Sequence, residues 1–356
     1  MPKGIFSLNE VHAEQTSNDW SSGAWVSSNA ILTKESSYGY YCGGRTPGLT
    51  IEYLSTVDRI DYSNSDLVAS VRGPLDRGRW YTEATVGNRS HLYVAGGMTT
   101  GADASAESTV SRIAYANDTI TAISKGSLIT GVAAAGMMGG SDRGYWAMGF
   151  SSQGSPPPAV TITQRIDYAN DTLGTVVKGN TTYQKYGVSG VCSLENGLAR
   201  RPIIESFASG ASTTVPVTNY GYNYGGNNPA TTYVLRIDFD NDTSTSSPRG
   251  YLSAAKRYSA ATGNQSFGFN SCSYSPTIST VDRVDYSNDY AFASPRIPLT
   301  AARYGAAAVG NRNYGYFIAG LPGPMTSIDR IDYSNDYNHT AWVAGVTTAK
   351  HYAQAV

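Results

Sequence analysis

The sequence repeats a seven-residue segment six times. The segment reads Arg-Ile-Asp-Tyr-Ser-Asn-Asp with small changes, and its copies begin at Arg59, Arg112, Arg165, Arg236, Arg283 and Arg330. Subtracting successive positions gives spacings of 53, 53, 71, 47 and 47 residues. A spacing of roughly 40–50 residues is typical of one four-stranded blade of a β-propeller. The longest interval therefore holds one blade and an insertion, which we place at about 193–219.

Two further motifs alternate with this segment. An aromatic-Gly-aromatic motif that runs into small residues begins at Tyr38, Leu92, Gly144, Tyr220, Phe267 and Tyr314. A looser motif, a basic residue near an aromatic one and then small apolar residues, occurs at 303–311 and again at the chain end, 350–356. Short apolar runs favour buried strands, and alternation favours half-buried ones. We therefore predict that the apolar run, the aromatic motif and the Arg-Ile-Asp-Tyr segment form strands one, two and three of each blade.

The order of these motifs predicts how the ring closes. The repeats start with a strand-two motif at Tyr38 and end with a strand-one motif at Tyr352. Six blades are complete only if the C-terminal strand joins the N-terminal blade, which also protects strand edges. We predict an all-β, six-bladed propeller over residues 31–356, preceded by an N-terminal arm of residues 1–30. The fourth strands should follow the turns, for example at 67–71 and 290–293.

The composition excludes several classes of protein. Lys and Arg (26) almost balance Asp and Glu (27), and no basic run stands out, so we expect no nucleic-acid partner. No segment approaches the roughly 20 apolar residues needed to span a bilayer, so we expect no membrane insertion. The three cysteines are far apart and the four histidines are scattered. We therefore predict no disulfide framework, no metal site and no cofactor.

The charged residues of the repeat are expected to be structural. The arginines named above are followed two positions later by Asp61, Asp167, Asp238, Asp285 and Asp332, with Ala114 in the second copy. A ring of these carboxylates around a channel cation is one interpretation. The alternative is a repeated Arg/Asp hydrogen-bond pattern between neighbouring blades. The replacement by Ala114 favours the second interpretation.

Strand order also predicts two different faces. One face carries the one-to-two and three-to-four connections, which are tight Gly-Asn and Asn-Asp turns; we call it the flat face. The other carries the longer two-to-three and four-to-one connections; we call it the variable face and expect binding specificity there. The insertion should project from the flat face as a docking contact, or be a tolerated surface loop. Its candidate binding residues, with two from the next strand, are Arg200, Arg201, Ile203, Ile204, Phe207, Tyr220 and Tyr222.

These motifs resemble those of known families. The basic-aromatic segment, the strand ending in Gly43-Gly44, Gly96-Gly97 or Gly225-Gly226, and the Tyr-containing turn resemble the kelch repeat of β-propellers. The glycine pair is altered at Gly149-Phe150, Phe269-Asn270 and Gly320-Leu321. The run Ser-Thr-Val-Asp-Arg-[Ile/Val]-Asp-Tyr-Ser-Asn, at 55–64 and 279–288, is similar to repeats in virion proteins of marine tailed bacteriophages, cyanophages especially.

The second resemblance implies a role in the virion. We expect a non-enzymatic structural or adhesion protein of the tail or the capsid exterior. Its arm would attach to other virion proteins, and its loops would contact a virion neighbour or a host surface glycan. The alternative is a carbohydrate-active enzyme, a glycan hydrolase or oxidase, on the same scaffold. No nucleophile elbow or phosphate-binding loop is visible, so we name no catalytic residue.

Overall fold

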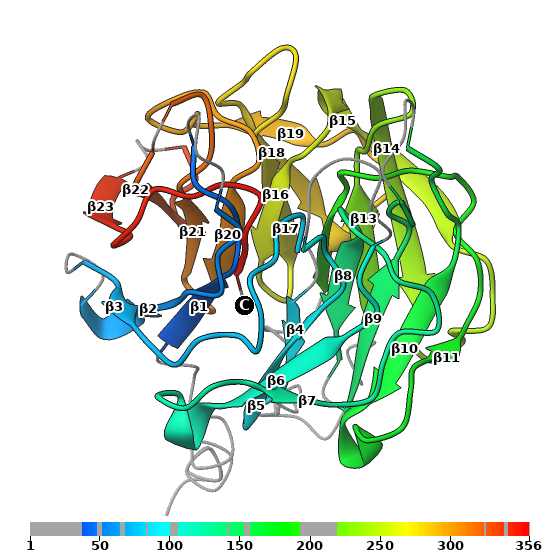
Figure 1. Ribbon diagram of the computed structural model, residues 1–356. Helices are drawn as coiled ribbons and strands as arrows, with labels where there is room; N and C mark the ends of the chain where they lie inside the picture. Colours follow the sequence, from blue (N-terminus) through cyan, green and yellow to red (C-terminus); the bar gives the residue numbers. More distant parts are fainter. Residues whose placement is uncertain are drawn as a thin grey trace, which may run out of the picture.

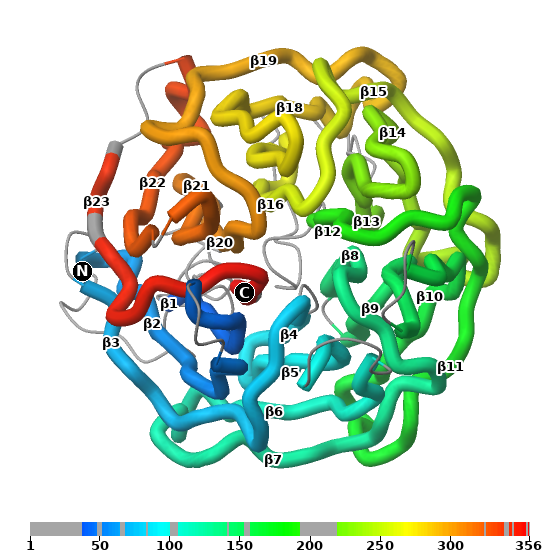
Figure 2. The backbone as a smooth tube through the Cα atoms, turned by 45° about the horizontal axis from the view of Figure 1, so that its top comes forward, coloured from blue at the N-terminus to red at the C-terminus, as the bar shows by residue number. Residues whose placement is uncertain are grey.

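The computed structural model has the predicted architecture, an all-β propeller of six blades (Figure 1). It describes residues 38–47, 52–64, 68–82, 85–99, 106–140, 142–152, 157–192, 219–323, 325–337 and 341–355. Each blade is one four-stranded antiparallel sheet, and the six sheets are arranged as a ring (Figure 2). The predicted arm, residues 1–30, lies outside the described residues.

The strands of the six blades have the following bounds. Blade 1 contains β24 (Gln354–Ala355), β1 (Tyr38–Cys42), β2 (Val57–Asp61) and β3 (Ser70–Val71). Blade 2 contains β4 (Thr85–Gly87), β5 (His91–Ala95), β6 (Val110–Ala114) and β7 (Ile123–Ser124). Blade 3 contains β8 (Gly136–Gly139), β9 (Arg143–Ala147), β10 (Thr163–Asp167) and β11 (Val176–Val177). Blade 4 contains β12 (Ser189–Cys192), β13 (Tyr220–Tyr224), β14 (Thr231–Asp238) and β15 (Ser247–Lys256). Blade 5 contains β16 (Ala260–Gly263), β17 (Phe267–Ser271), β18 (Val281–Asp285) and β19 (Ser294–Arg296). Blade 6 contains β20 (Ala307–Gly310), β21 (Tyr314–Ile318), β22 (Ser327–Asp332) and β23 (Ala341–Gly345).

Short 3-10 helices follow the third strand in four blades. They are η2 (Tyr62–Asn64), η3 (Tyr115–Asn117), η4 (Tyr168–Asn170) and η5 (Tyr286–Asn288). In blade 5 the preceding aspartate caps this turn, since the Asp285 carboxylate accepts from Ser287 N at 2.9 Å. The fourth strands begin later than predicted. The expected strand at 290–293 is turn, and β19 starts at Ser294, because residues 286–291 are used by the helix and its exit turn.

The predicted ring closure is confirmed. The two residues of β24 pair antiparallel with β1, so the C-terminal strand is the innermost strand of the N-terminal blade. On its other side, Thr85 Oγ1 of β4 donates to Ala355 O at 3.1 Å. The Lys350 ammonium, which precedes β24, forms a buried ion pair of 2.9 Å with Asp58 of β2. Ring closure therefore rests on buried charge as well as on strand pairing.

Aromatic rings stack across all six blade interfaces. The third residue of each strand two, a Tyr or Phe, stacks on the Tyr or Phe that ends the Arg-Ile-Asp-Tyr segment of the next blade. The six pairs, at ring-centroid distances of 4.6–5.2 Å, are Tyr40–Tyr115, Tyr93–Tyr168, Tyr145–Phe239, Tyr222–Tyr286, Phe269–Tyr333 and Tyr316–Tyr62. Such stacking contributes beyond the apolar area that it buries. Gly39 of β1 leaves room for the Tyr62 ring of the Tyr316–Tyr62 pair, because a Cβ on Gly39 would lie 2.4 Å from the Tyr62 hydroxyl.

The repeat arginines do link neighbouring blades, but through a different aspartate from the one expected. Five of the six pair with the aspartate at the end of the turn of the next blade, which we call the turn aspartate. The pairs, at 2.6–2.9 Å, are Arg59–Asp118, Arg112–Asp171, Arg165–Asp242, Arg236–Asp289 and Arg283–Asp336. At the sixth interface the sequence has Ser65 at the turn position, outside the described residues, and Arg330 stacks over Tyr314.

The aspartate of the repeat itself has a local role. Asp61, Asp167, Asp238, Asp285 and Asp332 each accept a hydrogen bond from the backbone amide two residues later, at 2.9–3.0 Å. They lie on third strands, away from the channel, so the interpretation of a carboxylate ring around a channel cation is wrong. Blade 2 lacks this cap, because Ala114 precedes η3 and its side chain accepts no hydrogen bond.

The glycine-pair register also differs from the prediction. The backbone positions equivalent to Gly43-Gly44 are Met148-Gly149, Cys272-Ser273 and Ala319-Gly320, one or more residues from the expected pairs. Met148, Cys272 and Ala319 adopt the left-handed φ that the first glycine has elsewhere, between +53° and +73°. The amide of the second residue can then donate to the four-to-one connection that leads into the next blade, as Ser273 N does to Arg303 O at 3.0 Å. The motif is thus defined by backbone geometry and tolerates other residues.

Candidate functional site: the variable face

Most of the predicted binding residues fall outside the described part of the chain. These are Arg200, Arg201, Ile203, Ile204 and Phe207, all within 193–218. The last described residue before this segment, Cys192, and the first after it, Asn219, both lie at the flat face, next to the start of β13. The insertion therefore joins the disc on the predicted face.

The two remaining predicted binding residues do not form a site. Tyr222 is fully buried, donates from its hydroxyl to Asp289 at 3.0 Å and stacks on Tyr286. Its prediction as a binding residue is wrong, because the aromatic-Gly-aromatic motif serves the blade interface. Tyr220 is half-buried and its ring is covered by the Arg236 guanidinium at 4.0 Å.

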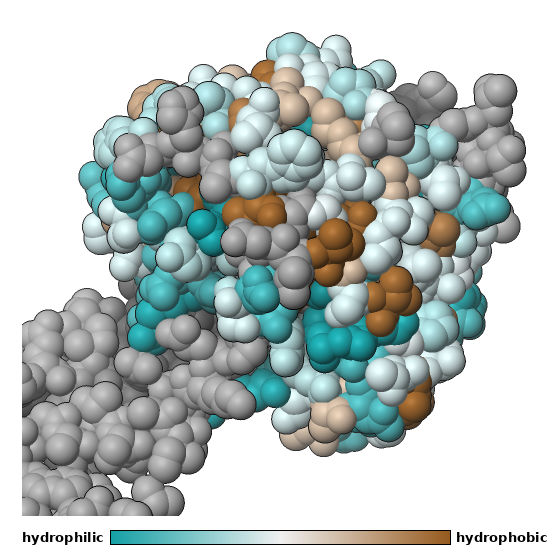
Figure 3. Space-filling view, turned by 90° about the vertical axis from the view of Figure 1, so that its left-hand side faces the viewer, coloured by the Kyte–Doolittle hydropathy of each residue, from teal (hydrophilic) through white to brown (hydrophobic). Residues whose placement is uncertain are grey.

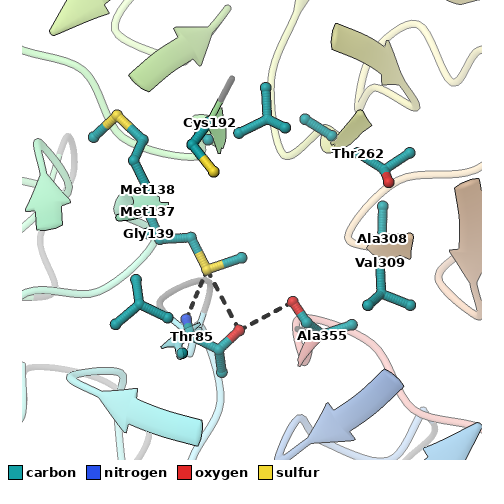
Figure 4. Close-up of a pocket in the computed structure, with 14 residues that line it drawn as sticks. Thr85, Met137, Met138, Gly139, Cys192, Thr262, Ala308, Val309 and Ala355 are labelled. Atoms are coloured by element: carbon teal, nitrogen blue, oxygen red, sulfur yellow. Dashed lines mark hydrogen bonds between the residues drawn. The ribbon is translucent and has the colours of Figure 1, made fainter. Parts of the chain in front are cut away.

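The central channel is narrow and largely apolar. Figure 4 shows its lining, in which Met137, Cys192, Thr262 and Val309 come from four different inner strands. The space available to a water-sized sphere is about 50 Å³. Only backbone groups and threonine hydroxyls bring polarity, and the visible hydrogen bonds join Thr85 to Ala355 and to the Met137 sulfur. The channel is a packed centre of the ring rather than a ligand cavity of the usual size.

A ring of left-handed residues closes the channel at the variable face. One residue of each four-to-one connection adopts a φ between +49° and +60°; these residues are Tyr81, Ala134, Gly187, Tyr258, Gly305 and Tyr352. The backbone amide of each donates to the carbonyl of the previous one around the ring, in five bonds of 2.7–3.1 Å from Ala134 to Tyr352. Left-handed backbone in a non-glycine residue carries strain, which is concentrated at functional and tightly determined positions.

Three tyrosines of this ring contact one another over the channel mouth. The centroid distances are 4.5 Å for Tyr81–Tyr352, 5.4 Å for Tyr258–Tyr352 and 5.9 Å for Tyr81–Tyr258. The intervening glycines make the space for them: a Cβ on Gly187 or Gly305 would lie 2.8–2.9 Å from a tyrosine ring. Tyr81 and Tyr258 are half-buried, so they cover the channel mouth and also contribute to the surface of the variable face.

Further aromatic rings extend this cluster across blades 5, 6, 1 and 2. Tyr274 lies 4.8 Å from Tyr304, Tyr304 lies 6.3 Å from Tyr352, and Tyr352 lies 6.2 Å from Trp80. We call these four residues the aromatic strip. Tyr274 is 43% exposed and Tyr304 is half-buried, whereas Tyr352 and Trp80 are each 6% exposed. Tyrosine and tryptophan on a rigid scaffold are well suited to binding, since they offer large area with little loss of conformational freedom.

An arginine stands at each end of the aromatic strip. The Arg45 guanidinium lies 4.3 Å above the Trp80 ring, and its Nε donates to His351 Nε2 at 2.8 Å. The Arg257 guanidinium lies 4.9 Å above the Tyr274 ring and donates to Asn227 Oδ1 at 3.0 Å. Burial and then the Arg45 charge lower the pKa of His351 to about 4, so its Nε2 is free to accept at neutral pH.

Buried ion pairs hold the face in place from below. Lys256–Asp282, Arg303–Asp329 and Lys350–Asp58 lie directly before three of the inner strands, and all six side chains are inaccessible to solvent. Burial lowers the pKa of Lys256 and of Lys350, and the neighbouring carboxylates oppose that shift. Breaking such a pair leaves an uncompensated buried charge. The connections that carry the aromatic strip are thus fixed by interactions that solvent does not weaken.

The remaining reactive residue types contribute no second site within the described chain. All three cysteines are buried, and burial raises the pKa of Cys42 to about 12 and that of Cys272 to about 11, which disfavours the thiolate. Across the described residues, no group of three or more His, Cys, Asp or Glu side chains is arranged to hold a metal ion. No helix in that part of the chain is long and apolar enough to cross a membrane.

The outer rim carries scattered apolar side chains. On the side formed by blades 6 and 1, the hydrophobic groups occur as small separate spots in a mostly polar surface (Figure 3). Exposed apolar residues scattered in this way are normal for a soluble protein surface. The described residues that this view shows form no broad apolar patch, and the variable face is the best-defined candidate site.

These features define a six-bladed β-propeller with a rigid aromatic face, a class of scaffold suited to ligand binding or adhesion. No family model matches the sequence, and no curated protein matches it. The six-bladed propeller fold expected from the motifs is confirmed.

Proposed function

We propose that the protein is a non-enzymatic recognition and adhesion module of a bacteriophage virion, which binds a host surface glycan through its variable face. The observation that carries the proposal is the aromatic strip, bounded by Arg45 and Arg257, on one face of a closed and rigid ring. Ligand sites combine aromatic area with a few fixed polar groups. A pyranose ring presents the matching surface, an apolar C–H face with hydroxyl groups at its edge.

In this proposal, attachment to the virion and recognition of the glycan take place on opposite faces of the disc. Residues 1–37 join the disc at Tyr38, whose strand partner is Asp61 at the flat face, and the insertion joins the same face between Cys192 and Asn219. The aromatic strip lies on the opposite face. An arm that attaches to other virion proteins would therefore leave the variable face pointing outward. This polarity supports the interpretation of the arm as the attachment segment.

Rigidity supports binding rather than turnover. Three carboxylates beneath the aromatic strip, Asp282, Asp329 and Asp58, are each committed to a buried ion pair. Glycoside hydrolysis commonly needs two carboxyl groups that face the sugar from either side. We therefore propose no catalytic role for these residues and expect the glycan to be bound unchanged.

A glycan array with matched tyrosine variants tests the glycan proposal. Tyr274→Ala and Tyr304→Ala should weaken binding by more than about 1 kcal/mol each, as expected for central interface residues. Tyr290→Ala is the control, because Tyr290 is 69% exposed but belongs to a flat-face turn. Equal binding by all four proteins would contradict the proposal. Release of free sugars from a bound glycan would replace it with the carbohydrate-active enzyme.

Deleting residues 1–29 tests the virion proposal separately. The truncated protein should fold and bind glycan as the full chain does, because residues 38–355 form all six four-stranded blades and close the ring. It should fail to appear in assembled particles, as measured by mass spectrometry of purified virions. Normal incorporation of the truncated protein would contradict the role of the arm.

A further inference from the structure

We infer that the glycan bound by the variable face is acidic, carrying carboxylate or sulfate groups that Arg45 and Arg257 recognise. This inference rests on the proposed function and specifies its ligand class. The observation behind this inference is that neither Arg45 nor Arg257 belongs to the ion pairs that other charged groups of this face form.

The other basic side chains at this face already have partners. Arg79 pairs with Asp76 at 2.9 Å and Arg77 with Glu107 at 3.4 Å. The three buried cations described above pair with Asp282, Asp329 and Asp58. Lys185 donates instead to the carbonyl oxygens of Asn228 and Pro229 at 2.8 and 3.1 Å.

Arg45 and Arg257 form no carboxylate ion pair within the described chain. The one carboxylate left on this face there is the exposed Glu52, which has no ion pair with Arg45 among those residues. The two arginines thus give the aromatic strip a positive charge at each end. Anionic groups of a ligand complement such a surface and are attracted to it before contact.

Both guanidinium groups are also oriented in advance. Arg45 is fixed by stacking on Trp80 and by its Nε bond to His351, so its two terminal nitrogens are not needed for that bond. Arg257 is fixed by stacking on Tyr274 and by its Nε bond to Tyr274 O at 2.8 Å. A planar guanidinium held in this way matches the geometry of a carboxylate or sulfate oxygen pair. Holding the side chain in place before binding lowers the entropic cost of the contact.

The spacing of the strip sets the form of the ligand. The path from Tyr274 through Tyr304 and Tyr352 to Trp80 is continuous, with successive ring centroids 4.8–6.3 Å apart. A chain of several sugar rings can therefore contact both arginines while it crosses the strip. We accordingly expect an acidic polysaccharide rather than a single acidic sugar.

Paired polymers that differ in charge test this inference on the full-length protein. The probes are polygalacturonate with its methyl-esterified form, and dextran sulfate with dextran. The wild type should bind each charged polymer at least about tenfold more tightly than its neutral partner, and added salt should weaken that binding. Arg45→Gln and Arg257→Gln should each lower the affinity for the charged polymers about fivefold to tenfold and leave neutral binding unchanged.

Two control variants distinguish charge recognition from misfolding and from nonspecific binding. Arg89→Gln removes an exposed arginine of a flat-face turn and should leave every affinity unchanged. Arg45→Lys keeps the charge but loses the planar group that stacks on Trp80. Its affinity for the charged polymers should lie between that of the wild type and that of Arg45→Gln. The same variant tests the inference if Arg45→Gln folds poorly.

The outcomes distinguish the inference from the proposed function. Equal affinity for charged and neutral polymers, or unchanged affinity in the double arginine variant, would overturn the inference while glycan binding stands. Binding of poly-glutamate as tight as that of polygalacturonate would overturn the ligand class. If no polysaccharide binds in these assays or on the array, the proposed function fails as well.

Discussion

The Lys350 ammonium lies 2.9 Å from the Asp58 carboxylate, and neither side chain is accessible to solvent. The two residues are far apart in the sequence, and the pair joins the last inner strand to the first blade. The same ammonium donates to Tyr41 O and Thr56 O, at 3.3 and 3.4 Å. The final residues of the chain are therefore part of the core of the ring.

Replacing Lys350 should open the ring. Lys350→Met leaves Asp58 as an uncompensated buried charge and should lower the free energy of unfolding by about 3–5 kcal/mol. The control is Lys185→Met, at the same position of blade 4, where only carbonyl oxygens accept from the ammonium. The measurement is urea unfolding, and an equal loss in both variants would contradict the role of the ion pair. Adding Asp58→Leu to Lys350→Met should restore much of the loss, because no buried charge then remains.

Truncation of residues 350–356 should have a larger effect than either substitution. It removes β24, its pairing with β1 and its contact with Thr85 of β4. Unprotected strand edges and an open ring should lower the thermal midpoint of the whole propeller in one transition. A truncated protein that unfolds at the wild-type temperature would refute the closure.

The tyrosine hydroxyls at the blade interfaces should contribute individually. Tyr93 Oη donates to the turn aspartate Asp171 at 2.8 Å, so Tyr93→Phe should cost about 1–2 kcal/mol. Blade 5 supplies a natural comparison, because Phe269 occupies this position and the carboxylate of the turn aspartate that it faces, Asp336, accepts from Arg283 and Arg296 alone among the described residues. Phe269→Tyr should therefore stabilise the protein. Unfolding free energies that do not change in opposite directions would contradict this assignment.

The turn aspartate Asp171 should make the propeller sensitive to acid. Burial raises the pKa of Asp171, but hydrogen bonds from Tyr93, Arg112 and Lys125 outweigh it and bring the pKa below the ordinary 3.8. Because the folded protein binds this proton more weakly than the unfolded chain, the stabilisation is complete above pH 3.8 and is lost as the pH falls through the folded pKa. In Asp171→Asn, this part of the pH dependence should disappear and stability at pH 7 should fall by about 3 kcal/mol. Asp167→Asn, at an exposed turn cap, should change little at either pH.

His351 should act in a higher pH window. Its pKa of about 4 in the folded protein lies below the ordinary 6.5, because burial and Arg45 disfavour its protonation. The unfolded chain therefore binds the proton first, and stability should decline as the pH falls from 6.5 to 4. Protonation also removes the acceptor for Arg45 Nε. His351→Gln should flatten the stability curve across this window, and an unchanged curve would contradict the assignment.

Much of this architecture could be predicted from the repeat. The spacing of the Arg-Ile-Asp-Tyr segments gives six blades, and the motif order gives the closure by residues 350–356. The partner of each repeat arginine could not be predicted in the same way. Both the third and the seventh residue of the segment are aspartates, and only the fold shows that the seventh faces the preceding blade.

The candidate site was harder to predict than the fold. Tyr222 looked like a binding residue because the motif that contains it is rich in tyrosine, yet that motif is buried between blades. The left-handed ring had a weak sequence signal, since only Gly187 and Gly305 mark it and Tyr81, Tyr258 and Tyr352 adopt the same backbone without glycine. The aromatic strip joins residues from four blades, so no local pattern reveals it.

Hydroxyl-radical footprinting with and without a host surface polysaccharide tests the central claim most directly. The reactivity of Tyr274 and Tyr304 on the variable face should fall when the ligand binds. Tyr290 and Tyr337, which are 69% and 68% exposed and follow flat-face turns, should react as before. Protection of Tyr290 and Tyr337 with no protection of Tyr274 and Tyr304 would contradict the variable face as the recognition surface.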